Sequence, residues 1–334
     1  MPVARLAAYL LVIAALSAGC AAPAPAPSPA PAPTPGVAPS PAPAPSPAPA
    51  PAPTPAPTPS PPSATIEPAR VQQGDLAVLR LDKPVPGDVK VRVEGLDEQP
   101  TAFRQDGLPV AFLGFPAAAK VGTYPVTVTW DGGEWKGSVA VIYKKFTEDR
   151  LIVTPSLEQT YFDPRSDAEW ARVFKLRATS NARPLWQGPF QVPIRGKIEI
   201  TTYFGEIRYI NGTETGRHSG MDFAADTGTP AYAPARGKVI LAEPLILTGN
   251  TVILDHGDNL FTAFYHLSAM SVTPGQMVAP GQELGKVGST GFSTGPHLHW
   301  TATIGNTPVD PWPLTLAAPL GIAAPPPRGI ERIR

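Results

Sequence analysis

The chain has 334 residues, and its 27 Lys and Arg are balanced by 27 Asp and Glu, so the formal net charge is zero. A chain with few, balanced charges offers no basic surface for nucleic acid. Its single cysteine, Cys20, excludes an internal disulfide and a cysteine-based zinc site. The length is enough for two or three domains.

Residues 1–20 have the features of an export signal. The only charge, Arg5, precedes an apolar run from Leu6 to Leu16, which is shorter than the roughly 20 residues that span a bilayer. The following Ser17-Ala18-Gly19-Cys20 resembles the lipobox of bacterial lipoproteins, although its first residue is serine where leucine is usual. The resemblance implies a lipid on the cysteine and a membrane anchor in the bacterial cell envelope. Ordinary cleavage near Ala18 to Ala22, giving a secreted protein, is the alternative.

Residues 21–64 alternate proline with alanine or serine. Proline at every second position blocks helix and sheet, so we expect a disordered, polyproline-like spacer. About forty residues at roughly 3.1 Å each reach on the order of 130 Å when extended. A docking site for proline-binding domains is the alternative, but flanking basic and aromatic residues are missing. The tail, 317–334, is proline-rich and weakly basic, and we expect it to be flexible.

Residues 65–145 carry short strand patterns separated by turn signals. The sequence Asp131-Gly132-Gly133 predicts a hairpin turn. The expected strands are Leu76–Leu81, Val89–Val93, Leu108–Phe115, Tyr124–Trp130 and Trp135–Tyr143. Five to seven strands at this spacing predict a small immunoglobulin-like β-sandwich module. It has no histidine or clustered carboxylates, so we expect a structural role or the binding of a cell-wall or envelope protein partner.

The connector after this module is expected to contain one short helix, over about 166–178. Ser166 and Glu169 form a capping-box signature. Trp170 and Phe174 then fall at helical spacing, and we expect both to pack against a domain.

Residues 191–316 carry a second set of strand patterns without a long helical one, which predicts an antiparallel β-sheet domain. The expected strands are Lys197–Phe204, Gly237–Ala242, Asn250–Asp255, Leu260–His266 and His299–Ile304.

All five histidines of the chain lie at or after position 218: His218, His256, His266, His297 and His299. Neutral imidazole with a carboxylate companion is a common zinc ligand set. His297 and His299 face the same way on a strand, and His218 and Asp222 share a face in either a helix or a strand. We expect the second pair on a loop that enters a strand. Together, the two pairs predict a metal site better than either pair alone.

The histidines stand in a longer pattern of segments: Phe204-Gly205 with Arg208, His218 to Ala224, Gly228-Thr229-Pro230, Tyr265-His266-Leu267, Thr273-Pro274-Gly275-Gln276, Ala279-Pro280-Gly281-Gln282, Ser293 to His299, and Val309-Asp310-Pro311. Over about residues 190–315, this pattern resembles the lysostaphin/LytM-type family of peptidoglycan zinc metalloendopeptidases. One departure is Trp300-Thr301, which stands where the family usually has Phe-Glu.

The resemblance implies one Zn²⁺ per chain, bound by His218, Asp222 and His299. It also implies two catalytic histidines that line the site without binding metal, His266 and His297. Three protein ligands leave a fourth position for water, as in catalytic zinc sites. A neutral histidine can accept a proton there, and a protonated one can stabilise the oxyanion or protonate the leaving amine. The sequence leaves open which histidine does which.

Three other residues have weaker claims to the site. His256 lies in the turn-like sequence Asp255 to Asn259 and is expected to be structural or on the surface. Tyr209 and Thr294 are candidates for substrate contact. Neither residue points to the bond that is cut.

The expected divisions are a signal peptide (1–20), a Pro/Ala-rich linker (21–64), a β-sandwich module (65–145), a connector (146–190), a zinc metalloendopeptidase domain (191–316) and a flexible tail (317–334). The predicted function is hydrolysis of the peptide stems or cross-links of peptidoglycan in the cell envelope. A non-catalytic LytM-like regulator that binds the wall and activates a separate amidase is the alternative, but such members typically lack a ligand. An unrelated structural zinc protein is a third and weaker hypothesis.

Overall fold

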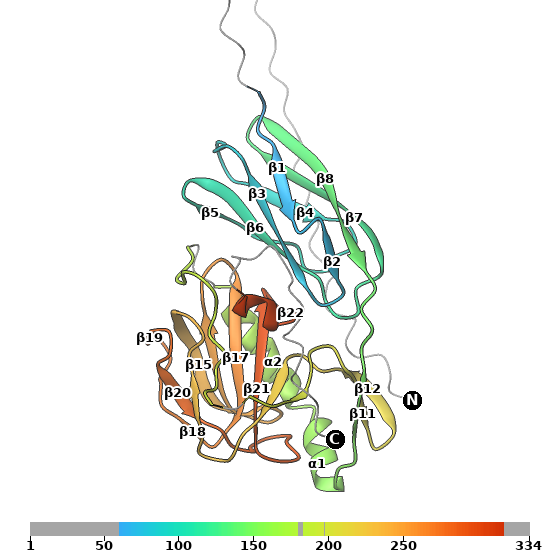
Figure 1. The fold of residues 1–334 in the computed structure, drawn as a ribbon, viewed down its shortest axis with the longest axis vertical. Helices are drawn as coiled ribbons and strands as arrows, with labels where there is room; N and C mark the ends of the chain where they lie inside the picture. Colours follow the sequence, from blue (N-terminus) through green and yellow to red (C-terminus); the bar gives the residue numbers. More distant parts are fainter. Residues whose placement is uncertain (1–59, 180–182, 197, 317–334) are drawn as a thin grey trace, which may run out of the picture. The chain divides into compact units, whose positions relative to one another are not determined.

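The computed structural model describes residues 60–179, 183–196 and 198–316, in which strands predominate (Figure 1). The expected export signal, the lipid on Cys20, most of the spacer and the tail lie outside these residues. Among the described residues, no helix is long and apolar enough to cross a membrane.

The first described part consists of two four-stranded sheets. One sheet has the order β1 (Ala64–Glu67), β3 (Leu76–Leu81), β6 (Leu108–Gly114) and β5 (Ala102–Gln105). The other has the order β2 (Arg70–Gln72), β8 (Gly133–Ile142), β7 (Gly122–Trp130) and β4 (Lys90–Val93). Alternate apolar residues of both sheets share one core. Trp130 pairs with Gly133, so the predicted hairpin turn is present. The immunoglobulin-like assignment stays a prediction.

The connector contains β9 (Glu148–Leu151), α1 (Pro155–Tyr161) and α2 (Ser166–Arg177). The predicted helix is present, but the predicted capping box is wrong. Ser166 lies inside α2, and its hydroxyl donates to the carbonyl of Asp163. Glu169 instead accepts a hydrogen bond from the backbone N–H of Ile246, which lies in the loop between residues 245 and 249, beside α2.

The two aromatic residues of α2 have different surroundings. Trp170 packs edge-on against Tyr265, with ring centroids 6.4 Å apart. Phe174 remains 44% exposed, so the prediction that both aromatic residues pack against a domain holds only for Trp170.

An eight-stranded antiparallel sheet forms the framework of the second part, so the predicted antiparallel β architecture is confirmed. In spatial order its strands are β10 (Ile200–Thr202), β13 (Met221–Ala224), β21 (His297–Ile304), β17 (Leu260–Leu267), β16 (Gly249–Asp255), β15 (Gly237–Leu245) and β19 (Met277–Val278), with β22 (Thr307–Val309) paired to β21. The strand expected over Lys197–Phe204 is therefore shorter than predicted.

Two three-stranded sheets and a short 3-10 helix complete this part. One sheet has the order β14 (Pro230–Tyr232), β20 (Glu283–Lys286) and β18 (Ala269–Met270). The other has the order β12 (Thr213–Arg217), β11 (Ile207–Ile210) and β9, and in it β9 runs parallel to β11. The 3-10 helix is η1 (Trp312–Thr315).

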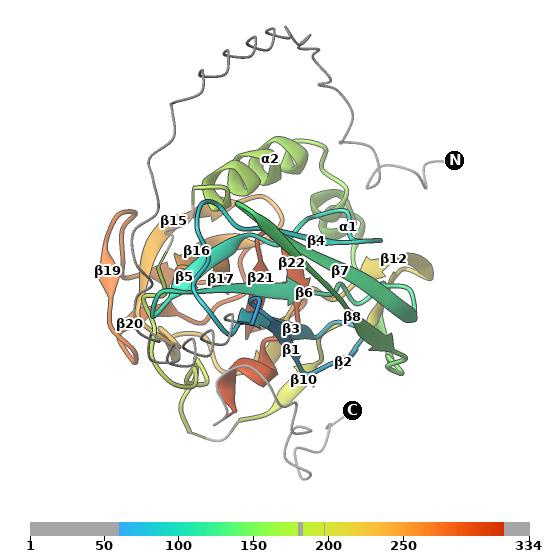
Figure 2. The ribbon, with the colours of Figure 1, turned by 90° about the horizontal axis from the view of Figure 1, so that it is seen from above.

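The two faces of the eight-stranded sheet have different neighbours. On one face, Phe264, Leu298 and Trp300 are fully buried in a core that also holds residues of the β14–β20–β18 sheet. On the other face lies α2 (Figure 2), whose Val173 packs in a cluster with Tyr265 of β17. Tyr265 is paired with His299 across the strands. Since side chains alternate along a strand, the odd-numbered residues of β21 point to the α2 side.

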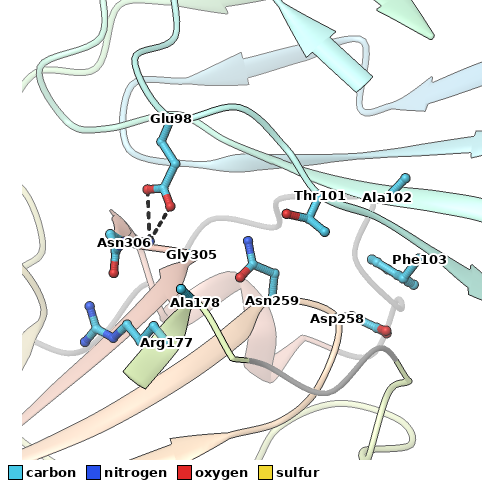
Figure 3. Close-up of a pocket in the computed structure, with 10 residues that line it drawn as sticks. All are labelled: Glu98, Thr101, Ala102, Phe103, Arg177, Ala178, Asp258, Asn259, Gly305 and Asn306. Carbon is cyan, nitrogen blue, oxygen red and sulfur yellow. Dashed lines mark hydrogen bonds between the residues drawn. The ribbon is translucent and has the colours of Figure 1, made fainter. Parts of the chain in front are cut away.

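Direct contacts join the sandwich strands to the second part. Apolar residues of β3, β5 and β6 form one cluster with Leu260, Ile304 and Val309. A polar contact also joins the two parts: both carboxylate oxygens of Glu98 accept from the backbone N–H of Asn306, each at 2.9 Å (Figure 3). These groups border a pocket of about 320 Å³.

Candidate metal centre and groove

His218, Asp222 and His299 meet at one buried point. His218 lies on the loop that enters β13, Asp222 lies on β13, and His299 is its register partner on β21. His218 Nε2 is 3.0 Å from His299 Nδ1 and 3.1 Å from Asp222 Oδ2, and His299 Nδ1 is 2.8 Å from Asp222 Oδ1. One ligand atom from each residue can be chosen with all three within 4.8 Å of one another. Such a convergence is what a single metal ion requires.

Backbone carbonyls face the Nδ1 atom of three histidines. The Nδ1 atoms of His218, His266 and His297 lie 2.8 to 3.0 Å from the carbonyl oxygens of Tyr203, Thr290 and Gly295, respectively. A carbonyl only accepts, so each Nδ1 carries a proton, and in the neutral ring Nε2 then has the lone pair. These hydrogen bonds leave Nε2 of His218 available as a metal ligand, in the manner of outer-shell partners at metal sites.

The electrostatics of the cluster favour a cation. Burial by itself raises the pKa of Asp222, but the facing His218 and His299 outweigh it and hold this pKa well below the usual range. Burial lowers the pKa of His299 to about 4, so this imidazole is neutral at pH 7. The cluster thus holds an ionised carboxylate that is only 6% exposed and faces two imidazole rings. Two imidazoles and one carboxylate are also a donor set that suits zinc.

His266 and His297 form a second pair beside the cluster. Their ring centroids are 4.8 Å apart, and Nε2 of His297 is 3.7 Å from Asp222 Oδ1. Burial, followed by repulsion from His297 and His299, lowers the pKa of His266 to about 3. His266 also has φ of 61°, a left-handed conformation that is uncommon for a residue with a side chain. Backbone strain of this kind is concentrated at functional sites.

The cluster opens into a groove of about 260 Å³. Both histidines of the second pair line it, together with Thr294. Arg208 lines the groove as well, and its guanidinium is paired with Asp149 at 2.6 Å. Tyr209 is not among the described residues that line this groove.

His256 lies outside this arrangement. It is fully buried, and its two ring nitrogens contact Arg236 O at 2.9 Å and Thr262 Oγ1 at 2.8 Å. Burial lowers its pKa to about 4, so it is neutral at pH 7. This is a structural histidine, in line with the sequence-based interpretation.

Several features of the groove cannot be predicted from the sequence. The fixing carbonyls leave no sequence signal, because every residue has one. The Asp149–Arg208 pair depends on the parallel pairing of β9 with β11, which the charged sequence of β9 does not suggest. Arg208 belongs to the family-like sequence pattern, which does not indicate what its side chain does.

A buried His–Asp–His cluster on an antiparallel sheet, with two more histidines in the adjoining groove, is the arrangement of a β-sheet metallohydrolase. The chain belongs to peptidase family M23, whose family model matches residues 216–311. A crystal structure of an M23 peptidase from Pseudomonas aeruginosa aligns with a TM-score of 0.51 and 30% identity, covering 72% of this chain and 92% of that one.

Several relatives have names that state an activity, and two of them illustrate the similarity. Peptidoglycan DD-endopeptidase ShyA of Vibrio cholerae is 37% identical over 119 residues, which is 35% of this chain and 28% of the relative. DD-carboxypeptidase/endopeptidase Mpg of Neisseria meningitidis is 43% identical over 102 residues, which is 30% of this chain and 24% of the relative. The match thus spans about a quarter of the length of these relatives.

Proposed function

We propose that this protein is a zinc-dependent endopeptidase that hydrolyses the peptide part of peptidoglycan in the cell envelope. The observation that carries the proposal is the convergence of His218, Asp222 and His299 at one buried point beside two further histidines. Membership of the M23 family supports hydrolysis as the reaction class.

His218 Nε2, one oxygen of Asp222 and His299 Nδ1 would hold the metal. When bound, zinc polarises a carbonyl and lowers the pKa of water toward about 7. In the neutral form, His266 and His297 each have a lone pair on Nε2, because each Nδ1 donates a hydrogen bond to a carbonyl. One of them accepts a proton from the attacking water, and the other, once protonated, gives a proton to the leaving amine.

The names of the relatives suggest the bond. ShyA is named a DD-endopeptidase, and Mpg a DD-carboxypeptidase/endopeptidase. We therefore propose a cross-link between two D-amino acids as the first substrate to test. The anchor on Cys20 and the binding role of residues 65–145 remain proposals that follow from the sequence.

Digestion of purified, cross-linked peptidoglycan tests the function. The full chain, loaded with zinc, is expected to release peptide fragments whose masses identify the bond that was cut. His218→Ala is expected to lose zinc and activity together. If the zinc-loaded wild type releases no fragments, or if His218→Ala digests as well as the wild type, the proposal fails.

The same preparation separates the enzyme from the non-catalytic regulator. A regulator needs no metal, so metal-free protein would still activate an amidase. An enzyme is expected to contain about one zinc per chain, as three-ligand catalytic sites do. His256→Gln provides a control, because it replaces a buried histidine outside the cluster and should leave the zinc content unchanged.

A further inference from the structure

We propose that Thr301 is a positioning residue that orients the metal ligand His299. This inference rests on the metal site of the proposed function. It adds a buried hydroxyl that contacts one of the ligands and an aromatic ring that stacks on the same ligand.

The first contact is between His299 and Thr301. Nε2 of His299 lies 2.8 Å from Thr301 Oγ1, and the two residues share one face of β21. The other ring nitrogen, Nδ1, faces Asp222 and His218, so it must present its lone pair to a metal. The ring proton then sits on Nε2, where it needs an acceptor. Thr301, which is 2% exposed, supplies it.

The hydroxyl of Thr301 can act as that acceptor, because a hydroxyl oxygen has two lone pairs. Its contact with Nε2 of His299 therefore favours the histidine tautomer that a metal at Nδ1 requires.

Packing fixes the rings as well as the protons. The ring of Tyr265 stacks on that of His299, with centroids 4.9 Å apart and an angle of 7° between the planes. Trp170 of α2 packs against the outer side of Tyr265. The rotation of the His299 ring is therefore limited by a stack that ends on the helix.

Trp170 belongs to α2, so the connector contributes to the packing around a metal ligand as well as joining the two β parts. Thr301 also stands where the family pattern usually has glutamate. In this chain a neutral hydroxyl takes that place.

Zinc affinity tests the proposal. Zinc-free protein is titrated in competition with a chromogenic chelator, and the absorption spectrum of the Co²⁺-loaded protein reports ligand geometry. Thr301→Val keeps the shape and removes the acceptor, so it is expected to weaken zinc binding about 10- to 100-fold, as losses of outer-shell partners do. Thr301→Ser restores the hydroxyl and is expected to bind zinc within about threefold of the wild type. Thr301→Ala also removes the acceptor, without introducing a second methyl group, and is expected to weaken binding in the same direction as Thr301→Val.

Thr303→Val is the matched control. Thr303 lies two residues further along the same strand, is 2% exposed, and its hydroxyl has no hydrogen-bond partner among the described residues. This variant should bind zinc as the wild type does. Thermal unfolding of the zinc-free variants shows which of them fold. If Thr301→Val does not fold, the comparison of Thr301→Ala with Thr301→Ser provides the test.

The outcomes separate this inference from the function itself. If the wild type binds no zinc, the proposed function fails. If the wild type binds zinc and Thr301→Val binds it equally well, with the same Co²⁺ spectrum, only the positioning role is overturned. Equal losses in Thr301→Val and Thr301→Ser would also overturn it, because the hydroxyl would then not be the cause.

Discussion

At the scale of single residues, His297 and His299 differ in what their ring nitrogens face. Nδ1 of His299 lies 2.8 Å from the carboxylate of Asp222. In His297, by contrast, Nδ1 donates to a backbone carbonyl, and Nε2 lies 3.7 Å from the same carboxylate. Two histidines on one strand face thus take different places in the site. The difference leads to separable effects of mutation.

His297→Ala is expected to keep zinc and to lose about 10²-fold or more in the rate of fragment release, the usual size of a general acid or base contribution. His299→Ala is expected to lose the metal. The zinc-to-protein ratio from elemental analysis and the rate of peptidoglycan digestion, measured on the same samples, check both expectations. An empty site in His297→Ala would contradict the division of roles.

Close packing explains why position 220 is a glycine. A Cβ at this position would lie 2.4 Å from Trp300 O, 2.7 Å from His299 Nε2 and 2.8 Å from Thr301 Oγ1. Gly220→Ala must therefore push β21 away, and we expect a loss of about 1–3 kcal/mol in the free energy of unfolding, as for other overpacked sites. At Gly295, a Cβ would meet no described atom within 4 Å, so Gly295→Ala should be close to neutral. Urea unfolding of zinc-free protein measures both changes, and equal stabilities would refute the packing argument.

At the scale of elements, the strands of the two β parts follow the alternation that the sequence shows. In β21, Leu298 and Trp300 enter the core while His297 and His299 point away, as the period of two predicts. Such patterns mark a strand wherever one of its faces is buried. They fail for β9, whose charged residues have no apolar period and which is held by backbone pairing to β11 and by the Asp149–Arg208 ion pair.

The candidate site shows the same limit. Its ligand-type residues could be predicted, because histidine and aspartate carry their chemistry in the side chain. The carbonyls that fix the tautomers could not, since their positions depend on the path of the backbone. Trp170 and Tyr265 are 95 residues apart in the chain, and their contact depends on how α2 docks on the sheet.

The turn between β16 and β17 has a pH-dependent carboxyl. Asp258 is 3% exposed, and one of its oxygens has no partner among the described residues. Burial, with a smaller effect of Asp255, raises its pKa to about 7. Glu98 and Arg177 line the same pocket.

The folded state therefore holds a proton at Asp258 that the unfolded state has lost between about pH 4 and pH 7. Protonation of Asp258 favours folding most below pH 4, and this benefit is lost as the pH rises through about 7. We therefore expect the free energy of unfolding of Asp258→Asn, relative to that of the wild type, to increase by up to about 2 kcal/mol from pH 4 to pH 7.5. The increase is smaller than a fully buried carboxyl would give, because solvent in the adjoining pocket screens the charge. Urea unfolding of both proteins at the two pH values checks this. A difference that does not change with pH would contradict the shifted pKa.

At the scale of the whole molecule, one lysine links the sandwich to the end of the second β part. Lys144 lies between Asp75 and Asp310, at 3.5 and 3.0 Å, and its side chain is 23% exposed. Lys144→Met would leave two partly buried carboxylates facing each other without a cation. We expect a loss of about 2–3 kcal/mol in the free energy of unfolding, somewhat less than for a fully buried pair.

Lys136→Met is the control for this change. Lys136 pairs with Glu134 at the surface, with its side chain 66% exposed, so its loss is expected to cost less than about 0.5 kcal/mol. Both variants are compared with wild type by urea unfolding. Equal effects would show that the buried link does not contribute.

The apolar cluster between β3, β5, β6 and the strands that follow Leu260 has a consequence for synthesis of the chain on the ribosome. The sandwich strands emerge first and can close their own core before β21 and β22 exist. The apolar side chains on the outer face of β3, β5 and β6 stay uncovered until Ile304 and Val309 have been translated. A nascent chain that stalls between these points would carry an uncovered apolar surface and become a client for holdase chaperones in the cell.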